Sequence, residues 1–174
     1  TFFQKGEELI YDMYFKIGFT SAKAGKLSLS VSEGSHKGKG AHKMVFQSNT
    51  SGLANGIYAV HDTLTSYMTK DLVPMAYVKN AMEGGDFTQE ELLYNYAQGG
   101  KVKIQAKRHK NGEFRFDQNV DAEGCIYDLV SIIYYARTLD FSKMKAGDVA
   151  TINFISGQKL SSAEIEYVGT KRVK

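Results

Sequence analysis

The chain has 174 residues, of which 43% are hydrophobic and 24% are charged, and its formal net charge is +3. This length and composition are typical of one folded domain with a continuous core, and they exclude a disordered protein. The longest uncharged apolar stretch is far shorter than the roughly 20 residues that cross a bilayer, and scattered lysines make nucleic acid the less favoured partner. We therefore expect one domain over residues 1–174, with no transmembrane segment and no nucleic-acid surface.

The first third of the chain predicts strands separated by turns. Hydrophobic residues alternate over residues 7–17 and again over 26–32, which is the period of a half-buried strand. Residues 34–40 are interpreted as a polar glycine loop, and a third strand is predicted over about residues 41–49. Residues 53–62 form either a short helical turn or a crossover.

Further strands are predicted in pairs that are joined by short turns: residues 63–70, 73–83, 90–97, 101–110, 113–120, 148–155 and 160–168. Pro74 should lie at an edge or at a strand start, because it has no N–H for the ladder. Asn111-Gly112 is the strongest hairpin signal, since both residues tolerate the positive φ of a type I′ turn. Strands this close in sequence predict antiparallel meanders.

Residues 127–141 predict a buried helix, because apolar residues recur at helical spacing: Ile126, Leu129, Val130, Ile133 and Tyr134. Asp128 is placed to cap the first turn by accepting hydrogen bonds from N–H groups two or three residues on. Arg137 lies in the last turn, where a cation suits the helix dipole. The predicted fold is mainly β: a curved antiparallel sheet or partly open β-barrel with one packed helix near residues 128–138.

No motif in the chain predicts a cofactor, a metal or a nucleophilic centre. The four histidines lack metal-ligand spacing, and no nucleophile elbow or phosphate-binding loop is present. Cys125 is the one cysteine, which forbids an intrachain disulfide, and we interpret it as a small core residue. The enzymatic alternative is a glycan hydrolase, because two of several carboxylates could gather at a cleft: Glu7, Glu8, Asp12, Asp117, Asp121, Glu123 and Asp128.

Two groups of residues are candidates for function. Asp128 and Arg137 are explained by capping and by dipole compensation, and an ion pair to a neighbouring strand would add orientation. Tyrosine and methionine are abundant, and some of these side chains could line an apolar cleft for a lipid or a glycan. The cleft-lining candidates are Tyr11, Met13, Tyr67, Tyr77, Tyr94 and Tyr96. The alternative is ordinary core filling.

Three segments resemble an exported bacterial domain-of-unknown-function family, number 3108: residues 6–12 with 24–27, residues 127–139, and residues 147–148 with 157–159 and 167–169. The resemblance implies export to the periplasm or the outer-membrane side, a curved antiparallel sheet with a packed helix, and no established activity or catalytic residue. Leu129 departs from the family, which commonly has proline there. The family also continues beyond Lys174, so the chain is expected to be truncated relative to it.

These observations favour an exported envelope protein that is not an enzyme. We expect its concave face to bind a hydrophobic ligand, a glycan or another envelope component. The start at Thr1-Phe2-Phe3 is interpreted as a mature or trimmed terminus. The alternatives are the carboxylate-dependent hydrolase and a pure scaffold or interaction domain.

Overall fold

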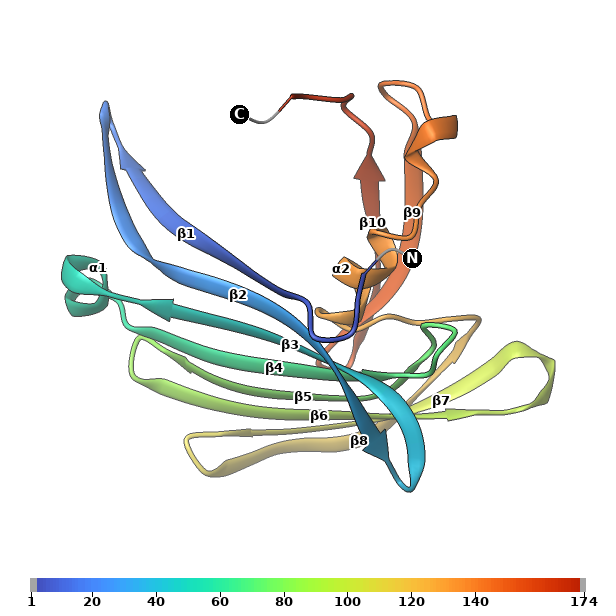
Figure 1. The fold of residues 1–174 in the computed structure, drawn as a ribbon. Helices are drawn as coiled ribbons and strands as arrows, with labels where there is room; N and C mark the ends of the chain where they lie inside the picture. Colours follow the sequence, from blue (N-terminus) through green and yellow to red (C-terminus); the bar gives the residue numbers. More distant parts are fainter. Residues whose placement is uncertain (1–2, 173–174) are drawn as a thin grey trace.

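The computed structural model describes residues 3–172, and the predicted start at Thr1 and Phe2 lies outside the described residues. Eight antiparallel strands form one curved sheet in chain order (Figure 1). They are β1 (Glu8–Ile17), β2 (Thr20–His36), β3 (Lys39–Thr50), β4 (Val60–Met68), β5 (Pro74–Glu83), β6 (Asp86–Tyr96), β7 (Lys101–Lys110) and β8 (Glu113–Glu123). The predicted meander is confirmed. Within the described residues β1 and β8 do not pair, so the sheet is curved and not closed into a barrel.

The remaining elements are short. A second sheet consists of β9 (Val149–Ser156) and β10 (Lys159–Glu166), and the α-helices are α1 (Gly52–Ile57) and α2 (Ser131–Ala136). Two 3₁₀ turns, η1 (Gln98–Gly100) and η2 (Phe141–Lys143), complete the described elements. Thus the helical alternative was the right one for the segment after β3. No helix in residues 3–172 has the length and apolarity needed to span a membrane.

Turn chemistry explains where several strands end. Asn111 and Gly112 have φ of 54° and 80°, which confirms the predicted hairpin turn. Pro74 is the first residue of β5, as its missing N–H requires. The predicted glycine loop over residues 34–40 is wrong. Because Lys37 and Gly38 both have positive φ and form a two-residue turn, β2 and β3 stay paired out to His36 and Lys39.

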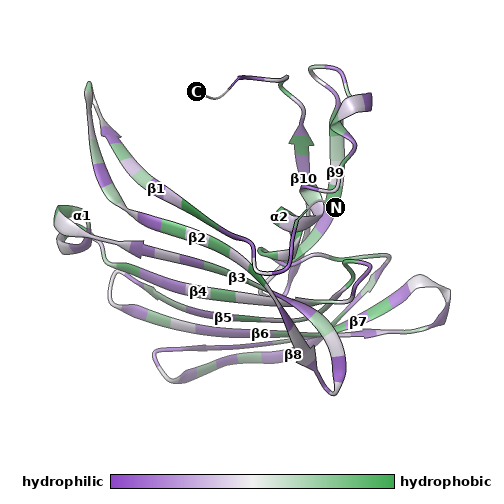
Figure 2. Ribbon diagram, viewed as in Figure 1, coloured by the Kyte–Doolittle hydropathy of each residue, from purple (hydrophilic) through white to green (hydrophobic). Residues whose placement is uncertain are grey.

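Helix α2 and the β9–β10 hairpin lie over the concave side of the sheet (Figure 1). Hydrophobic and hydrophilic residues alternate along the strands (Figure 2), as expected where one face is covered. The core between the sheet and the α2–β9 layer includes Met44, Leu92, Ile104, Val130 and Tyr134, all with no exposed surface.

Contacts of β9 and of the hairpin turn hold the β9–β10 hairpin against the rest of the fold. Tyr127 bridges to β9, since its N–H donates to the Asn153 carbonyl at 3.0 Å and its carbonyl accepts from the Ile155 N–H at 2.8 Å. At the hairpin turn, the N–H of Gly157 donates to Glu90 Oε1 at 3.1 Å. Glu90 is buried on β6 and is ion-paired with Arg108 of β7. This charge-assisted contact fixes the turn of the second sheet on the first.

Candidate functional site

The site is built around α2, and Asp128 sets where that helix begins. The Asp128 side chain is fully buried. Its Oδ1 accepts from the N–H groups of Val130 at 3.0 Å and Ser131 at 2.8 Å, which confirms the predicted cap. Its Oδ2 accepts from Ser66 Oγ on β4 at 2.9 Å, so the capping residue also ties the helix to the sheet.

Helix α2 covers Ser131–Ala136 and is shorter than the predicted 128–138. At its end, the N–H groups of Thr138 and Leu139 donate to carbonyls three residues back, and the Thr138 hydroxyl also donates to the Tyr135 carbonyl at 2.7 Å. These tighter bonds replace the α-helical pattern and satisfy the last carbonyls. The helix therefore ends two residues before the predicted end and places Tyr135 and Thr138 at its open end.

Burial raises the pKa of the Asp128 carboxyl, and the hydrogen bonds that it accepts from Ser66 and the α2 backbone oppose that rise. Tyr77 and Tyr94 carry buried hydroxyls with no hydrogen-bond partner within the described part of the chain. Both oxygens of the Asp128 carboxyl already accept hydrogen bonds, one from backbone N–H groups at the start of α2 and the other from Ser66. A positioning role for Asp128 follows from this geometry.

Arg137 joins the end of α2 to the residue before β1. Its guanidinium donates to both carboxylate oxygens of Glu7, at 2.5 and 3.1 Å. This pairing lowers the pKa of Glu7, chiefly through the hydrogen bond with Arg137. The neighbouring Tyr134 hydroxyl donates to the Ser30 carbonyl of β2 at 3.1 Å. Together these contacts hold α2 against the first hairpin and fix the chain that precedes Glu7.

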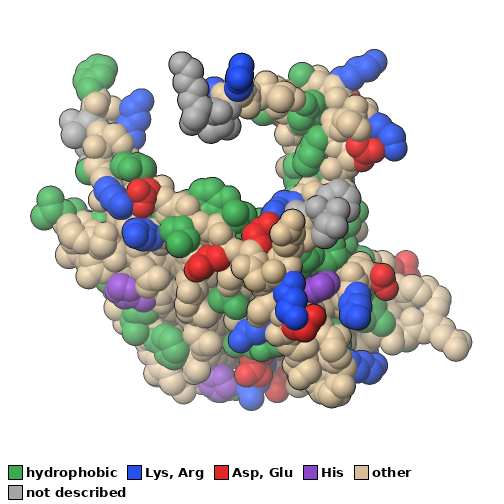
Figure 3. All heavy atoms as spheres, viewed as in Figure 1, with side chains coloured by type: hydrophobic (Ala, Val, Ile, Leu, Met, Phe, Trp, Pro, Cys, Tyr) green, Lys and Arg blue, Asp and Glu red, His purple; other side chains and the backbone are tan. Residues whose placement is uncertain are grey.

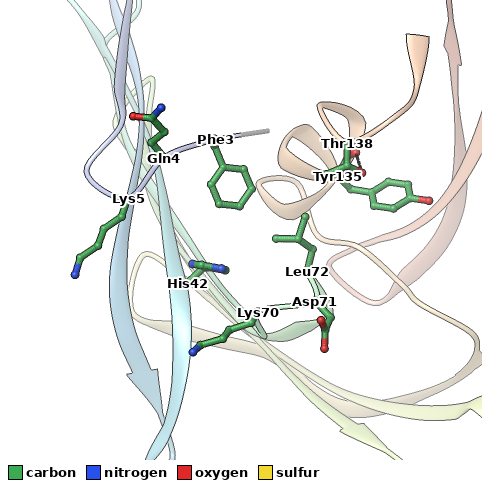
Figure 4. A pocket seen from close by; sticks show the side chains of 9 residues that line it. All are labelled: Phe3, Gln4, Lys5, His42, Lys70, Asp71, Leu72, Tyr135 and Thr138. Atoms are coloured by element: carbon green, nitrogen blue, oxygen red, sulfur yellow. Dashed lines mark hydrogen bonds between the residues drawn. The ribbon is translucent and has the colours of Figure 1, made fainter. Parts of the chain in front are cut away.

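A cavity of about 670 Å³ lies where these supports meet. It is lined by the N-terminal segment, β3, the β4–β5 turn and the end of α2: Phe3, Gln4, Lys5, His42, Lys70, Asp71, Leu72, Tyr135 and Thr138 (Figure 4). Figure 4 shows the Phe3 ring and the Leu72 side chain pointing into the space between the segments. The Phe3 ring also meets His42 and Tyr134 edge-on, with centroids 5.5 and 5.6 Å away.

Leu72 adopts an unusual backbone conformation at this cavity. Its φ is 60°, a left-handed value that is rare for a residue other than glycine, asparagine or aspartate. The β4–β5 turn enforces it: the Leu72 N–H donates to the Thr69 carbonyl at 3.0 Å, and the Val73 N–H donates to Thr69 Oγ1 at 3.1 Å. Strain of this kind persists where the surroundings over-determine it, often at binding sites.

Basic side chains lie at one side of the cavity. In Figure 4 the ammonium groups of Lys5 and Lys70 both point away from the Phe3 ring toward the outside. Lys5 is paired with Glu33 at 2.9 Å in an exposed ion pair, which is weak in water. Asp71 is the one carboxylate among the described lining residues, so this cavity does not hold the carboxylate pair that glycoside hydrolysis uses.

The predicted cleft-lining residues lie elsewhere, and their role stays a prediction. Tyr94 and Tyr96 stack with centroids 6.3 Å apart and line a second cavity of about 360 Å³ with His36, Lys37 and Lys39 among its other walls. Tyr77 is 1% exposed, in the core. Tyr11 and Met13 lie on β1, and Tyr67 contacts the His36 ring.

Sequence reasoning did not single out the residues of the larger cavity. Phe3, His42, Leu72 and Thr138 come from four distant parts of the chain, and no spacing links them. Within residues 3–172, histidine, cysteine and acidic side chains form no group of three that could hold a metal ion. Phe3 and Leu72 make the cavity largely apolar, and Lys5 and Lys70 make part of its rim basic.

Comparisons with known proteins give one match. A family model described as "Protein of unknown function (DUF3108)" matches residues 10–174, which confirms the resemblance found in the sequence. No curated protein and no solved structure matches the chain significantly.

Proposed function

Because this chain belongs to the DUF3108 family of proteins of unknown function, its role has to be inferred from its site, and we propose that it binds a single-chain amphiphile with an anionic group. The occupied site is the cavity between the N-terminal segment, the β4–β5 turn and the end of α2. The apolar chain lies against Phe3 and Leu72, and the anionic group lies at the rim, near Lys70 and His42. The protein acts in this proposal as a binding protein and not as an enzyme.

The observation that carries the proposal is the combination of apolar walls and basic rim in one cavity of suitable size. Ligand cavities of proteins measure about 300–1,000 Å³ and are mostly apolar with a few placed polar groups. The volume of about 670 Å³ falls in that range. Phe3 and Leu72 supply apolar surface, while Lys70 and His42 supply positive or hydrogen-bonding groups on one side.

The anchoring of the walls supports a preformed site. Asp128 fixes the start of α2, Arg137 fixes the chain before β1, and Thr69 fixes the turn that carries Leu72. A cavity whose walls are already ordered loses little conformational entropy when a ligand enters.

We also propose that the protein works in the bacterial envelope, where lipid-derived amphiphiles are abundant. Support for this location comes from the family resemblance alone. Fractionation of a Gram-negative host that makes the natural full-length gene product would place the protein with periplasmic or membrane markers. Recovery with cytoplasmic markers would overturn the location and leave the binding proposal standing.

Titration with oleate, followed by isothermal calorimetry, tests the binding. Saturable binding at a one-to-one ratio is expected, and Leu72→Gln should weaken it about tenfold by placing a polar amide on an apolar wall. Leu53→Gln is the matched control, because Leu53 is 88% exposed on α1, away from the cavity. Absence of saturable binding, or equal affinity in the two variants, would overturn the proposal.

A further inference from the structure

The two edges of the large sheet have opposite character. On β1 several large apolar side chains are exposed: Ile10 at 61%, Tyr11 at 49%, Tyr14 at 60% and Phe15 at 52%. On β8 most exposed side chains are charged or polar: Glu113, Arg115, Asp117, Gln118, Asn119, Asp121 and Glu123. Charged edges resist pairing with other strands, whereas long apolar edges invite it. Thus the β8 edge exposes mainly polar side chains to solvent, whereas the β1 edge exposes large apolar ones.

The apolar residues of β1 lie on both faces of the strand. Because neighbouring side chains alternate, Ile10 and Tyr14 lie on one face, and Tyr11 and Phe15 lie on the other. A packed layer on one face would therefore leave the other exposed. The paired strands β1 and β2 form an arm that projects from the rest of the molecule (Figure 1). Figure 3 shows exposed hydrophobic side chains at the end of this β1–β2 arm, in the upper left. An additional strand beside β1 gives the side chains on both faces cross-strand neighbours at once.

We propose that β1 pairs antiparallel with β1 of a second copy, with the two-fold axis at Asp12, so that the two large sheets become continuous. The residues of β1 are complementary to their own reverse about this point. Glu8 lies opposite Lys16 of the second copy, and the same pair recurs on the other side of the axis. Opposite charges in directly facing positions stabilise a strand pair.

The remaining positions match as well. Leu9 faces Phe15, and Ile10 faces Tyr14, so an aliphatic side chain meets an aromatic one in four places across the interface. The two Asp12 carboxylates meet at the axis, where each is already paired with Lys23 of its own chain at 2.7 Å. Pairing slipped by one residue would place Leu9 opposite Lys16 and lose the charge pairs, so the register is specified.

Cysteine cross-linking tests the register. In a Cys125→Ser background, Asp12→Cys should give a disulfide-linked dimer under mild oxidation, because facing Cα atoms of antiparallel strands lie about 4.5–5.5 Å apart, within disulfide range. Lys26→Cys is the matched control, because Lys26 is exposed on β2 directly beside Asp12 and takes no part in the charge pairs. Two copies of that position would lie three strand spacings, or about 14 Å, apart, and no link should form. Links at both positions, or at neither, would overturn the proposed pairing.

Charge exchange tests the dimer without a cross-link. Light scattering over a dilution series should show the wild type at twice the 19.3 kDa of one chain. Glu8→Lys and Lys16→Glu should each weaken the dimer about tenfold, since each places like charges opposite in two positions. The double variant should restore it. A wild type that is monomeric at every concentration would overturn the proposal. The same holds if the monomer instead binds lipid vesicles through the exposed aromatic residues of β1. An unrestored double variant would overturn the register.

Discussion

The two ends of the concave face differ in what covers them. Under α2 and β9 the side chains of Met44, Leu92 and Ile104 have no exposed surface. On the β1–β2 arm, Tyr11 and Phe15 lie on the same face and are about half exposed, and Figure 3 shows an open notch between this arm and the β9–β10 hairpin. Both ends have the same alternating pattern. Alternation thus identifies a face of a strand, but whether a second layer covers that face depends on the rest of the fold.

The largest expected effect of this difference is on stability. Ile104→Ala removes a fully buried side chain and should lower the free energy of unfolding by about 2–5 kcal/mol. Ile10→Ala on the exposed arm should change it by less than about 0.5 kcal/mol in dilute, monomeric protein. Urea denaturation of both variants measures the difference. Similar losses at the two positions would show that the arm is covered in solution.

The next effect concerns the cap that holds α2 on the covered end. Asp128→Ala leaves two N–H groups of α2 and the Ser66 hydroxyl without their acceptor, so a loss of about 1–3 kcal/mol is expected. Glu123→Ala is the control, because Glu123 is an exposed residue on β8, away from α2. If the two denaturation midpoints agree, the cap does not hold the helix.

The pH dependence of the cap sharpens this prediction. Burial raises the pKa of Asp128 in the folded protein. The contribution of this carboxyl to the free energy of unfolding is therefore fully present below the ordinary aspartate pKa of about 3.9, and it is lost as pH rises through the pKa of the folded state. Asp128→Asn does not titrate and can still accept from the helix N–H groups. The variant should therefore gain stability relative to the wild type as pH rises above about 4. Denaturation at several pH values measures this gap, and a gap that stays constant would contradict burial of a titrating carboxyl.

The smallest effect is expected at the strained turn. Leu72→Gly relieves a left-handed backbone that disfavours most side chains, but it also makes the unfolded chain more flexible, so a net change within about 1 kcal/mol is expected. The same variant should bind oleate at least several-fold more weakly, because an apolar wall of the cavity is lost. Thermal denaturation and calorimetry on one sample separate the two. Unchanged binding would remove Leu72 from the site.

These regions also show which features of the fold could be predicted from the sequence. Local signals were sufficient for the meander, for the Asn111-Gly112 turn and for the Asp128 cap, because each depends on residues close in the chain. The β2–β3 turn was missed because glycines and polar residues around Lys37 and Gly38 are typical of a loop as well as of an exposed hairpin. Tyr11 and Tyr77 are both tyrosines on strands, but the tertiary fold leaves Tyr11 half exposed and buries Tyr77. The residue type alone could not separate them.

The cavity could not be predicted for a similar reason. Phe3, Leu72 and Thr138 become neighbours only after the sheet has curved and α2 has docked, and these positions share no motif. The positive φ of Leu72 has no signal in its side chain, since leucine rarely adopts it. Conversely, the Asp128 cap could be predicted because capping follows a local rule. Arg137 lies just after the last turn of α2, and its partner Glu7 is 130 residues away, so this ion pair could not be predicted from the sequence.

The most direct test of the binding account is a map of the oleate site by backbone amide chemical shifts in nuclear magnetic resonance. Saturable shifts are expected for the N–H groups around Phe3, Leu72 and Thr138, three segments that only the folded cavity brings together. Shifts confined to residues 94–96, or to the exposed aromatic residues of β1, would contradict the assignment of the ligand to this cavity.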